Sequence, residues 1–413
     1  MKVVLISIAF PPKRDPESLQ VAKYCKYLKQ RNDIQLEVVT SRDPTLFMET
    51  DSSLIPYCEG IVVRQRIWIL ENRYVNFLLR KIHSNLLRYP DSKFTFWWQH
   101  KKIFNSVEKP DVIYSRSYPM SSTLAALELK KKWNIPWVLH LSDPWAVATE
   151  NSQSPAVLTG RAKKWNQKKE QESLVLADKI CLTSHKTIEL YKSEYPLLKD
   201  KFVYMPNVFD DDRVVSNPFV FNDRLTFTYT GGFAAFRSPV PLLEAIKRFW
   251  EMAQTKIGNR VQFLFTGEMA RSNYKIFSDY STIPIIKHLG VIPHNEVMTL
   301  QAQADILINV DSNILESRQA VYFPSKLLDY IIAQRRVVAI TNHYSTTYEV
   351  VQGKLGDCFE FDEIEKLAEH FIFVLDRFIK RDDTYFSISK IEQEFSARLN
   401  ADRLANLFLE VKK

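Results

Sequence analysis

The chain has 413 residues, of which 46% are hydrophobic and 25% charged, and this ordinary globular composition excludes a disordered chain or a fibre. Glycine is scarce, with 9 residues where average usage would give about 29. Neither G-x-G-x-x-G nor G-x-x-x-x-G-K-[ST] occurs, which disfavours the familiar dinucleotide and P-loop sites. At roughly 100–200 residues per domain, the length favours two domains.

The charge balance is basic, with 56 lysines and arginines against 48 acidic residues and a net charge of +8. Such an excess suits an anionic partner, and a solvated basic surface is the alternative. The four cysteines are scattered without C-x-x-C or metal-binding spacing, which predicts reduced thiols in a cytoplasmic protein. Residues 1–9 are too short for a signal peptide, and no stretch approaches the roughly 18 apolar residues of a membrane span. We expect a protein that is dissolved in the cytoplasm or lies on a membrane.

Short apolar runs rich in β-branched residues alternate with helical patterns, which predicts an α/β fold. Because the runs are continuous rather than alternating, they are typical of strands buried on both faces of a parallel sheet. The predicted strands are 2–8, 34–40, 111–115, 136–141, 179–183, 201–205, 225–230, 261–266, 305–310 and 336–341. A first helix is expected after Asp15, a capping residue that Pro16 follows.

The stretch 206–224 is rich in proline, asparagine and aspartate, and the strand–helix rhythm restarts after it. We therefore predict two doubly wound, Rossmann-like domains that face a cleft, which is the default ligand site in such proteins. The expected division is 1–207 for the N-terminal domain and 208–395 for the C-terminal domain, with a final helix over 396–413 that crosses back to the first domain.

The stretch 322–330 is the most informative one for chemistry. Pro324 at a helix start leaves the amides of the next three residues free, which makes an anion site that the Lys326 ammonium strengthens. Asp329, one turn later, could accept two hydroxyls of a ribose. The alternative is an ordinary core helix with its charges in solvent. The predicted donor-binding residues of this stretch are Ser325, Lys326, Leu327 and Asp329.

Two further loops follow predicted strands in the second half. Gly231 and Gly232 would let a bulky ligand approach the backbone, and Arg237 could pair with a phosphate. A plain turn with a surface arginine is the alternative. The second set resembles backbone edges against which a nucleobase could lie, without being specific; it consists of Thr266, Gly267, Glu268 and Val291.

In the first half, the strand 136–141 delivers His140 and then Asp143 to its carboxyl end, where sites of α/β proteins gather. His140 could orient or donate to an oxygen, although a lone histidine at a strand end is often structural. Both are predicted catalytic residues.

Residues 73–102 support a membrane hypothesis. Apolar residues from Val75 to Leu86 form one helical face, basic residues accompany them, and two tryptophans follow, which suits an interfacial segment on anionic lipid. A helix docked on its own domain is the alternative. The residues predicted on the acceptor or membrane side are Lys13, Arg14, Arg80, Lys81, Trp97 and Trp98.

Taken together, the motifs resemble a family. They run in the order FPP (10–12), KPDVIYSRSYP (109–119), IPWVLHLSDPW (135–145), PNVFD (206–210), YTGGF…RSP (229–239), LGVIPHNEV (289–297) and FPSKLLDY (323–330). This order is similar to that of the two-domain GT-B glycosyltransferases, specifically the retaining family 4-like group of bacterial polysaccharide and glycolipid synthesis.

The resemblance implies a hexosyltransferase-type enzyme with a nucleotide-sugar in the C-terminal half and a saccharide or lipid-linked saccharide acceptor in the N-terminal half. Arg237 then matches a diphosphate-binding residue, Asp329 the ribose-binding second acid of an E-x7-E pair, and His140 the histidine near the donor sugar. The first acid falls on Val321, with Glu316 nearby as a substitute. The family implies retention of configuration, no metal and no cofactor, and the basic segment suggests a cytoplasmic enzyme peripheral to the inner face of the plasma membrane.

Other readings stay open. A GT-B sugar-nucleotide epimerase is the nearest enzymatic alternative. Asp210 and Asp212 form a D-x-D that in GT-A enzymes holds a metal, although here it falls in the inter-domain stretch. A basic nucleic-acid-binding protein would fit the charge, but the basic residues are dispersed and no recognised binding motif occurs, so no nucleic acid is expected.

Overall fold

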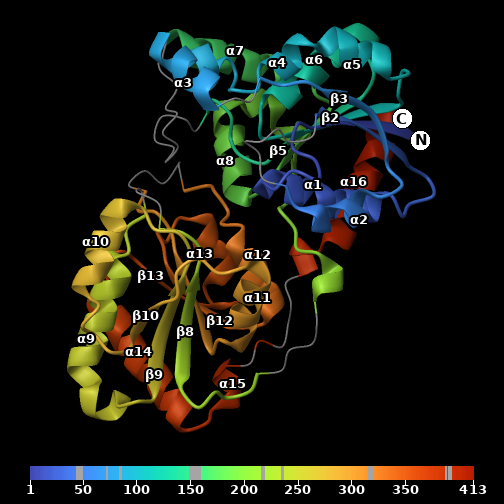
Figure 1. Cartoon of the computed structure of the whole chain (residues 1–413). Coiled ribbons are helices and arrows are strands. Elements are labelled where there is room, and N and C mark those ends of the chain that lie inside the picture. Colours follow the sequence, from blue (N-terminus) through green and yellow to red (C-terminus); the bar gives the residue numbers. More distant parts are fainter. Residues whose placement is uncertain are drawn as a thin grey trace. The chain divides into compact units, whose positions relative to one another are not determined.

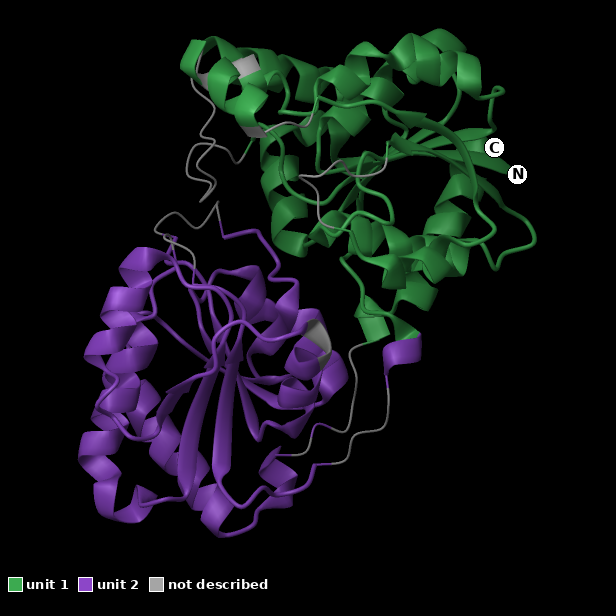
Figure 2. Cartoon of the chain, in the orientation of Figure 1, with its two compact units in different colours: residues 1–211, 393–413 green, residues 212–392 purple. Residues whose placement is uncertain are grey.

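The computed structural model describes residues 1–42, 50–70, 73–82, 86–147, 160–214, 219–233, 237–314, 320–386, 388 and 393–413. The chain forms two compact units (Figure 2). Unit 1 consists of residues 1–211 and 393–413, and unit 2 consists of residues 212–392. Each unit is built on its own parallel sheet with helices on both faces (Figure 1).

The sheet of unit 1 has, within the described residues, seven parallel strands in the order β3-β2-β1-β4-β5-β6-β7. The strands are β1 Lys2–Ile6, β2 Gln35–Ser41, β3 Val62–Ile67, β4 Val112–Ser117, β5 Trp137–Leu141, β6 Lys179–Leu182 and β7 Phe202–Tyr204. The helices are α1 Pro16–Leu28, α2 Ile55–Cys58, α3 Arg73–Ile82, α4 Thr95–Trp98, α5 His100–Ser106, α6 Ser121–Trp133, α7 Gly160–Leu176, α8 His185–Glu194 and α16 Ala397–Lys412.

The two faces of this sheet have separate cores. On one face, residues of α4 to α8 pack against the strands. On the other face, α1 and α16 do so, and the two helices contact each other. Helix α1 begins as its sequence predicts, because the Asp15 carboxylate accepts the Ser18 amide at 2.8 Å and Val21, Cys25 and Leu28 are buried.

The sheet of unit 2 has, in the part of the chain described, six parallel strands in the order β10-β9-β8-β11-β12-β13. The strands are β8 Leu225–Thr230, β9 Val261–Thr266, β10 Ile286–His288, β11 Ile306–Val310, β12 Arg336–Ile340 and β13 Gly356–Phe359. The helices are α9 Val240–Ile257, α10 Arg271–Asp279, α11 His294–Gln303, α12 Lys326–Ala333, α13 Thr346–Val351, α14 Ile364–Ile379 and α15 Asp383–Phe386. One face is covered by α9, α10 and α14, where stacked phenylalanines such as Phe227 and Phe263 fill the core (Figure 1).

The predicted α/β fold with two doubly wound parallel sheets is confirmed, and each of the ten predicted strands is present. Three strands, β3, β10 and β13, were not predicted. All three lie at the edges of their sheets, where a strand is only partly buried and needs no continuous apolar run. The sequences VVRQRI, IKH and GDCF therefore lack the pattern on which the prediction depended.

The segment by which the chain leaves unit 1 is held firmly to that unit. The buried Asp210 carboxylate accepts Lys26 Nζ at 2.7 Å and Tyr27 OH at 2.8 Å, and Tyr57 OH also donates to it. Asp211 accepts Ser396 Oγ at 2.5 Å and the amide of Arg398 at 2.8 Å, at the start of α16. The segment that leaves unit 1 at residues 210–211 and the segment that returns at residue 396 are therefore bonded to each other, and the first is also bonded to α1.

Candidate functional site

In unit 2, the loops after β8, β9 and β10 are joined through their backbones. The Gly231 amide donates to Thr266 O at 2.9 Å, and the Gly267 amide donates to Gly290 O at 3.0 Å. A Cβ atom on Gly267, whose φ is +130°, would lie 2.4 Å from Gly231 O, and one on Gly232 would lie 2.9 Å from Glu268 O. These glycines are therefore required first of all because neighbouring loops touch, which is a different reason from the ligand approach expected of them.

The other residues predicted along these loops have distinct surroundings. The buried Thr266 hydroxyl donates to Gly290 O at 2.8 Å, so it fixes the loop. Glu268 and Val291 are exposed and leave their side chains to solvent.

Lys326, the first residue of α12, has a side-chain amine that is buried inside unit 2. Its Nζ atom is buried, has no hydrogen-bond partner among the described residues, and lies 4.2 Å from the centre of the Tyr229 ring. Burial lowers the pKa of Lys326 well below its usual range; the positive charge of Arg237 lowers it further, while Asp311 acts in the opposite direction. The structure thus brings Lys326, Arg237 and the Gly231 loop together, as the sequence predicted.

Arg237 lies beside the same loop. Its Nη1 donates to Gly232 O at 3.3 Å, and its Nε is buried without a hydrogen-bond partner in the described part of the chain. Among the described residues, no hydrogen bond joins a carboxylate to Lys326 Nζ or Arg237 Nε, and two basic groups with such unused donors can bind an anion.

The start of α12 differs in one detail from the prediction of three free amides. The Leu327 amide donates to Pro324 O at 3.0 Å, so one of the three amides that were expected to be free is already used. The Leu327 side chain is buried, and Ser325 is exposed.

Asp329 lies one turn further along α12 and is half-buried. Its carboxylate is 3.8 Å from Arg213 Nη1, and Arg213 Nη2 contacts Met298 Sδ at 2.9 Å. Glu316, proposed as a substitute for the missing first acid, lies outside the described residues.

In unit 1, His140 is completely buried at the end of β5. Tyr114 OH lies 3.0 Å from its Nδ1, and Nε2 has no hydrogen-bond partner among the residues described. Burial lowers the pKa of His140 well below its usual value, and the nearby Arg116 cation adds to this, so the ring is neutral. The His140 side chain has no exposed surface, and its predicted catalytic role stays a prediction.

Asp143, three residues later, is exposed. Desolvation by neighbouring protein atoms and the negative charge of Glu17 raise the pKa of this carboxyl to about 6, while Arg116 acts in the opposite direction. An accessible carboxylate that titrates near neutrality can accept or return a proton.

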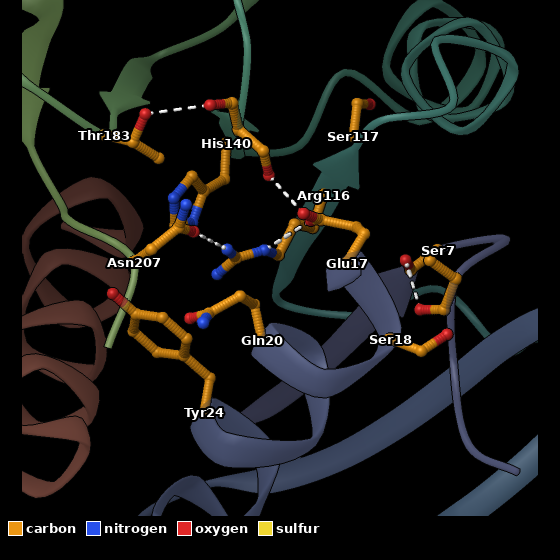
Figure 3. Close-up of polar contacts among 12 residues, drawn as sticks. Ser7, Glu17, Ser18, Gln20, Tyr24, Arg116, Ser117, His140, Thr183 and Asn207 are labelled. Atoms are coloured by element: carbon orange, nitrogen blue, oxygen red, sulfur yellow. Dashed lines mark hydrogen bonds and ion pairs between the residues drawn. The ribbon is translucent and has the colours of Figure 1, made fainter. Parts of the chain in front are cut away.

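Arg116 and Glu17 form a buried ion pair that the sequence reading missed (Figure 3). Arg116 Nε donates to Glu17 Oε1 at 2.6 Å, and Nη2 donates to Asn207 Oδ1 at 2.9 Å. Ser142 Oγ donates to the other Glu17 oxygen at 2.6 Å. The available signal was an arginine directly after the predicted buried strand 111–115, since a charge at the end of such a strand needs a partner if it is buried.

The residues predicted on the acceptor or membrane side do not form one surface. Lys13 is only 2% exposed and donates Nζ to Ile8 O at 2.5 Å, so the prediction that it faces a ligand is corrected: it holds the loop after β1. Arg14 and Lys81 are exposed, and the side chain of Arg80 lies outside the described set. Trp97 packs on Trp165 at 5.9 Å.

Helix α3 carries apolar side chains in solvent. The exposed fractions are 69% for Tyr74, 57% for Phe77, 57% for Leu78 and 78% for Ile82, with Trp98 at 64%. Val75 and Leu79, predicted on the same stripe as Leu78, are half-buried instead. None of the helices described has both the length and the apolar character that crossing a bilayer requires.

The D-x-D alternative requires Asp210 to bind a metal, but its carboxylate already accepts hydrogen bonds from Lys26, Tyr27 and Tyr57. Within the described residues, no group of three or more histidine, cysteine or acidic side chains could hold a metal ion.

Comparison with known proteins gives a consistent result. Residues 20–213, slightly under half of the chain, match the model of Glycosyltransferase Family 4. No curated protein matches the sequence. Among solved structures, the chain is similar to Anabaena Alr3699/HepE in complex with UDP and glucose, with 13% identity, 99% coverage of each chain and a TM-score of 0.61.

Two further solved structures have the same fold. Sucrose-phosphate synthase from Thermosynechococcus elongatus gives 13% identity, 99% and 98% coverage and a TM-score of 0.63. UDP-GlcNAc 2-epimerase from Neisseria meningitidis, bound to UDP-GlcNAc, gives 13% identity, 99% and 100% coverage and a TM-score of 0.58. The chain therefore has the GT-B fold of two Rossmann-like domains, as predicted.

Gly267→Ala tests the joined loops of unit 2. We expect it to destabilise the protein by about 3 kcal/mol or more, because the new Cβ would overlap Gly231 O in addition to the cost of a positive φ. Gly353→Ala is the matched control, since Gly353 also has a positive φ of +70° but no atom within 4 Å of the added Cβ, and it should cost about 1–2 kcal/mol. Urea denaturation followed by circular dichroism measures both, and equal losses would contradict the steric argument.

Proposed function

We propose that this protein is a glycosyltransferase that moves a sugar from a nucleotide-sugar donor to a hydroxyl of a saccharide or lipid-linked saccharide. The observation that carries the proposal is the buried ammonium of Lys326 beside Arg237 in unit 2, which has no hydrogen-bond partner in the described part of the chain. A cation buried without a partner is costly unless a ligand supplies the negative charge, and the diphosphate of a nucleotide-sugar does so. The GT-B fold and the family match over residues 20–213 support the same function.

On the donor side, these cations would stabilise the charge that develops as the nucleoside diphosphate leaves. The bond between the anomeric carbon and the diphosphate oxygen breaks, and its electron pair leaves with the diphosphate. The acceptor oxygen bonds to the anomeric carbon and loses its proton. Because Lys326 and Arg237 supply positive charge at the leaving group, we propose that no metal is needed. By resemblance to the family, we also propose a hexose donor and retention of configuration.

The remaining donor contacts follow from the positions of the predicted residues. Asp329 is proposed to bind the ribose hydroxyls, exchanging its long contact with Arg213 for shorter hydrogen bonds. Val291 would offer an apolar contact to the base. On the acceptor side, the exposed Asp143 carboxylate is proposed to accept a hydrogen bond, and then the proton, from the reacting hydroxyl.

Lys326→Met tests the donor site. We expect nucleoside diphosphates such as UDP and GDP to stabilise the wild-type protein in a thermal-shift assay, with affinity reduced about 30-fold or more in the variant because a charge-assisted contact is lost. Lys354→Met, at an exposed lysine, should leave the affinity unchanged.

The lowered pKa of Lys326 gives the same site a pH signature. Without a ligand its ammonium loses the proton at lower pH than usual, and a bound diphosphate restores the charged form. Binding should therefore take up a proton and weaken as pH rises, which calorimetry in buffers of different ionisation enthalpy measures. Proton release on binding would argue against this site.

The epimerase remains the closest alternative, because the Neisseria epimerase shares the fold. A panel of UDP-, GDP-, CMP- and dTDP-sugars, incubated with and without octyl glycosides as acceptors, separates the two. We expect a new glycoside only when both substrates are present. Conversion of the sugar without any acceptor would favour the epimerase, and silence of the whole panel in both binding and turnover would count against a sugar-nucleotide enzyme.

We further propose that α3 lies on an anionic membrane, which would bring the enzyme to a lipid-linked acceptor. Its exposed apolar residues and Lys81, whose Nζ lies 4.8 Å from the Phe77 ring centre, suit the interface between headgroups and acyl chains. Helix α7, which bonds to the segment after α3 through Asn166 and Arg88, adds exposed basic residues such as Arg161 and Lys164. The proposed location is the inner face of a bacterial plasma membrane, in polysaccharide or glycolipid synthesis.

The double variant Leu78→Asp/Ile82→Asp tests this surface. We expect about tenfold or greater loss of co-sedimentation with vesicles of phosphatidylcholine and phosphatidylglycerol, because both side chains would have to bury a charge in lipid. Leu197→Asp changes a leucine that is 97% exposed elsewhere on unit 1 and should have no effect. Undiminished binding by a folded double variant would contradict the proposal.

A further inference from the structure

The loop 142–146, which follows β5, presents a single exposed side chain from a fixed backbone. Ser142, Pro144, Trp145 and Ala146 are buried, and Asp143 between them is exposed. A loop with four buried residues has little freedom, so the direction of the Asp143 carboxylate is set by the contacts on each side of it.

On the first side, three different elements hold Ser142. Its amide donates to Ser117 O at 2.6 Å, at the end of β4, and its carbonyl accepts Thr183 Oγ1 at 2.8 Å, after β6. Its hydroxyl donates to Glu17 Oε2 at 2.6 Å. Glu17 belongs to the first turn of α1 and is itself held by Arg116 (Figure 3).

On the second side, a buried carboxylate holds Trp145 through a tyrosine. The Trp145 amide donates to Tyr191 OH at 3.0 Å, and Tyr191 OH donates to Glu170 Oε1 at 2.6 Å. Glu170 lies on α7 and Tyr191 on α8. The Trp145 indole is also fixed, since its Nε1 donates to Asn166 Oδ1 at 2.8 Å.

We propose that Glu17 and Glu170 are positioning residues that hold the Asp143 carboxylate where the acceptor's hydroxyl binds; this inference rests on the glycosyltransferase function proposed above. Removing carboxylates from water is costly, and neutral side chains could support the loop 142–146 if packing were their only role. The half-buried Glu17 and the buried Glu170, one on each side of an exposed carboxylate, fix its place before substrate arrives, which lowers the cost of ordering it in the reaction.

The titration of Asp143 links Glu17 to the chemistry. The titratable groups that face Asp143 in the described structure are Glu17, Arg116 and Tyr118. Desolvation and Glu17 hold the pKa of Asp143 above its usual value, at about 6, so the carboxyl is ionised and able to accept a proton above that pH. Removing the Glu17 charge must lower this pKa.

The groups that face Glu170 in the described structure are hydroxyls and backbone amides. Tyr191, Tyr195 and the backbone of residues 145 and 146 face it, and burial raises its pKa to about 7. The folded form thus binds a proton more tightly than the unfolded chain, so the free energy of unfolding falls as pH rises from about 4.3 towards 7. Glu170 therefore acts by fixing the position of the loop, and not by placing a charge near Asp143.

The first test follows Asp143 directly and needs no substrate. Protein labelled with ¹³C at the aspartate carboxyl carbon is titrated by NMR, with Asp143→Asn identifying the signal. We expect Glu17→Gln to shift the titration of Asp143 to lower pH by roughly half a unit or more. Ser142→Ala, which keeps the charge, should leave the midpoint nearly in place. An unmoved midpoint in folded Glu17→Gln would overturn the role of Glu17.

The second test uses turnover with UDP-, GDP-, CMP- and dTDP-sugars and octyl glycosides. We expect Glu170→Gln and Tyr191→Phe each to raise KM for the octyl glycoside about tenfold, and the double variant to add little, since both remove one chain of hydrogen bonds. The acid limb of the pH profile, set by Asp143, should move in Glu17→Gln but not in Glu170→Gln. Glu189→Gln, an exposed change on α8, is the control.

The outcomes separate the inference from the function. Unchanged acceptor KM in folded Glu170→Gln, or full turnover by Asp143→Asn, would overturn the positioning role while leaving the glycosyltransferase intact. Absence of nucleotide binding and turnover would overturn the function, and the NMR titration would still decide whether Glu17 controls Asp143.

Discussion

The organisation of unit 1 depends on the ion pair between Arg116 and Glu17. The guanidinium lies inside the protein, 4.9 Å from the centre of the Tyr24 ring, and its bonds to Glu17 and Asn207 connect β4 with α1 and with the segment that leaves the unit. Removing one partner of such a pair leaves an uncompensated buried charge, at a cost of about 3–5 kcal/mol. Through the second oxygen of Glu17, the same pair also fixes the end of β5 at Ser142.

Several buried charges of unit 1 have bonded partners, in contrast to Lys326 of unit 2. In unit 1, Arg116 is paired with Glu17, Asp210 with Lys26, and Glu170 with tyrosines. In unit 2, Lys326 Nζ lies over an aromatic ring, and no group among the described residues hydrogen-bonds to it. Because a buried charge without a bonded partner is costly, we expect a charged ligand to bind at Lys326.

The sequence predicts the interior of both sheets well because a strand buried on both faces must be apolar along its length. It fails at three of the four edge strands, β3, β10 and β13, where burial is partial and polar residues are tolerated. Lys326, Arg237 and Gly231, which the sequence analysis assigned to one predicted donor site, do lie near one another, and their role stays a prediction.

What the sequence could not predict are contacts between residues far apart in it. Arg116 and Glu17 are 99 positions apart, and the sequence around one residue does not identify the other as its partner. Lys13 reads as a surface charge in a loop, but a backbone carbonyl at Ile8 accepts its ammonium inside the protein. From the sequence, Gly231 and Gly232 are predicted to leave space for a ligand. In the structure, Gly232 and Gly267 are required because the loops after β8 and β9 pack too closely for a Cβ atom.

Unit 2 is an insertion within unit 1, because the chain returns from residue 392 to add α16 to the first core. A nascent chain that has reached residue 211 contains the residues of all seven described strands of its first sheet and α1, but it lacks α16, whose Ala401, Leu404 and Phe408 share one face with α1. The part of that face that α16 covers stays exposed until a further 181 or more residues are made, since unit 2 spans 212–392. During synthesis, the apolar surface that α16 later covers is therefore exposed to solvent while unit 2 is translated. A fragment that ends at residue 211 would expose this surface permanently.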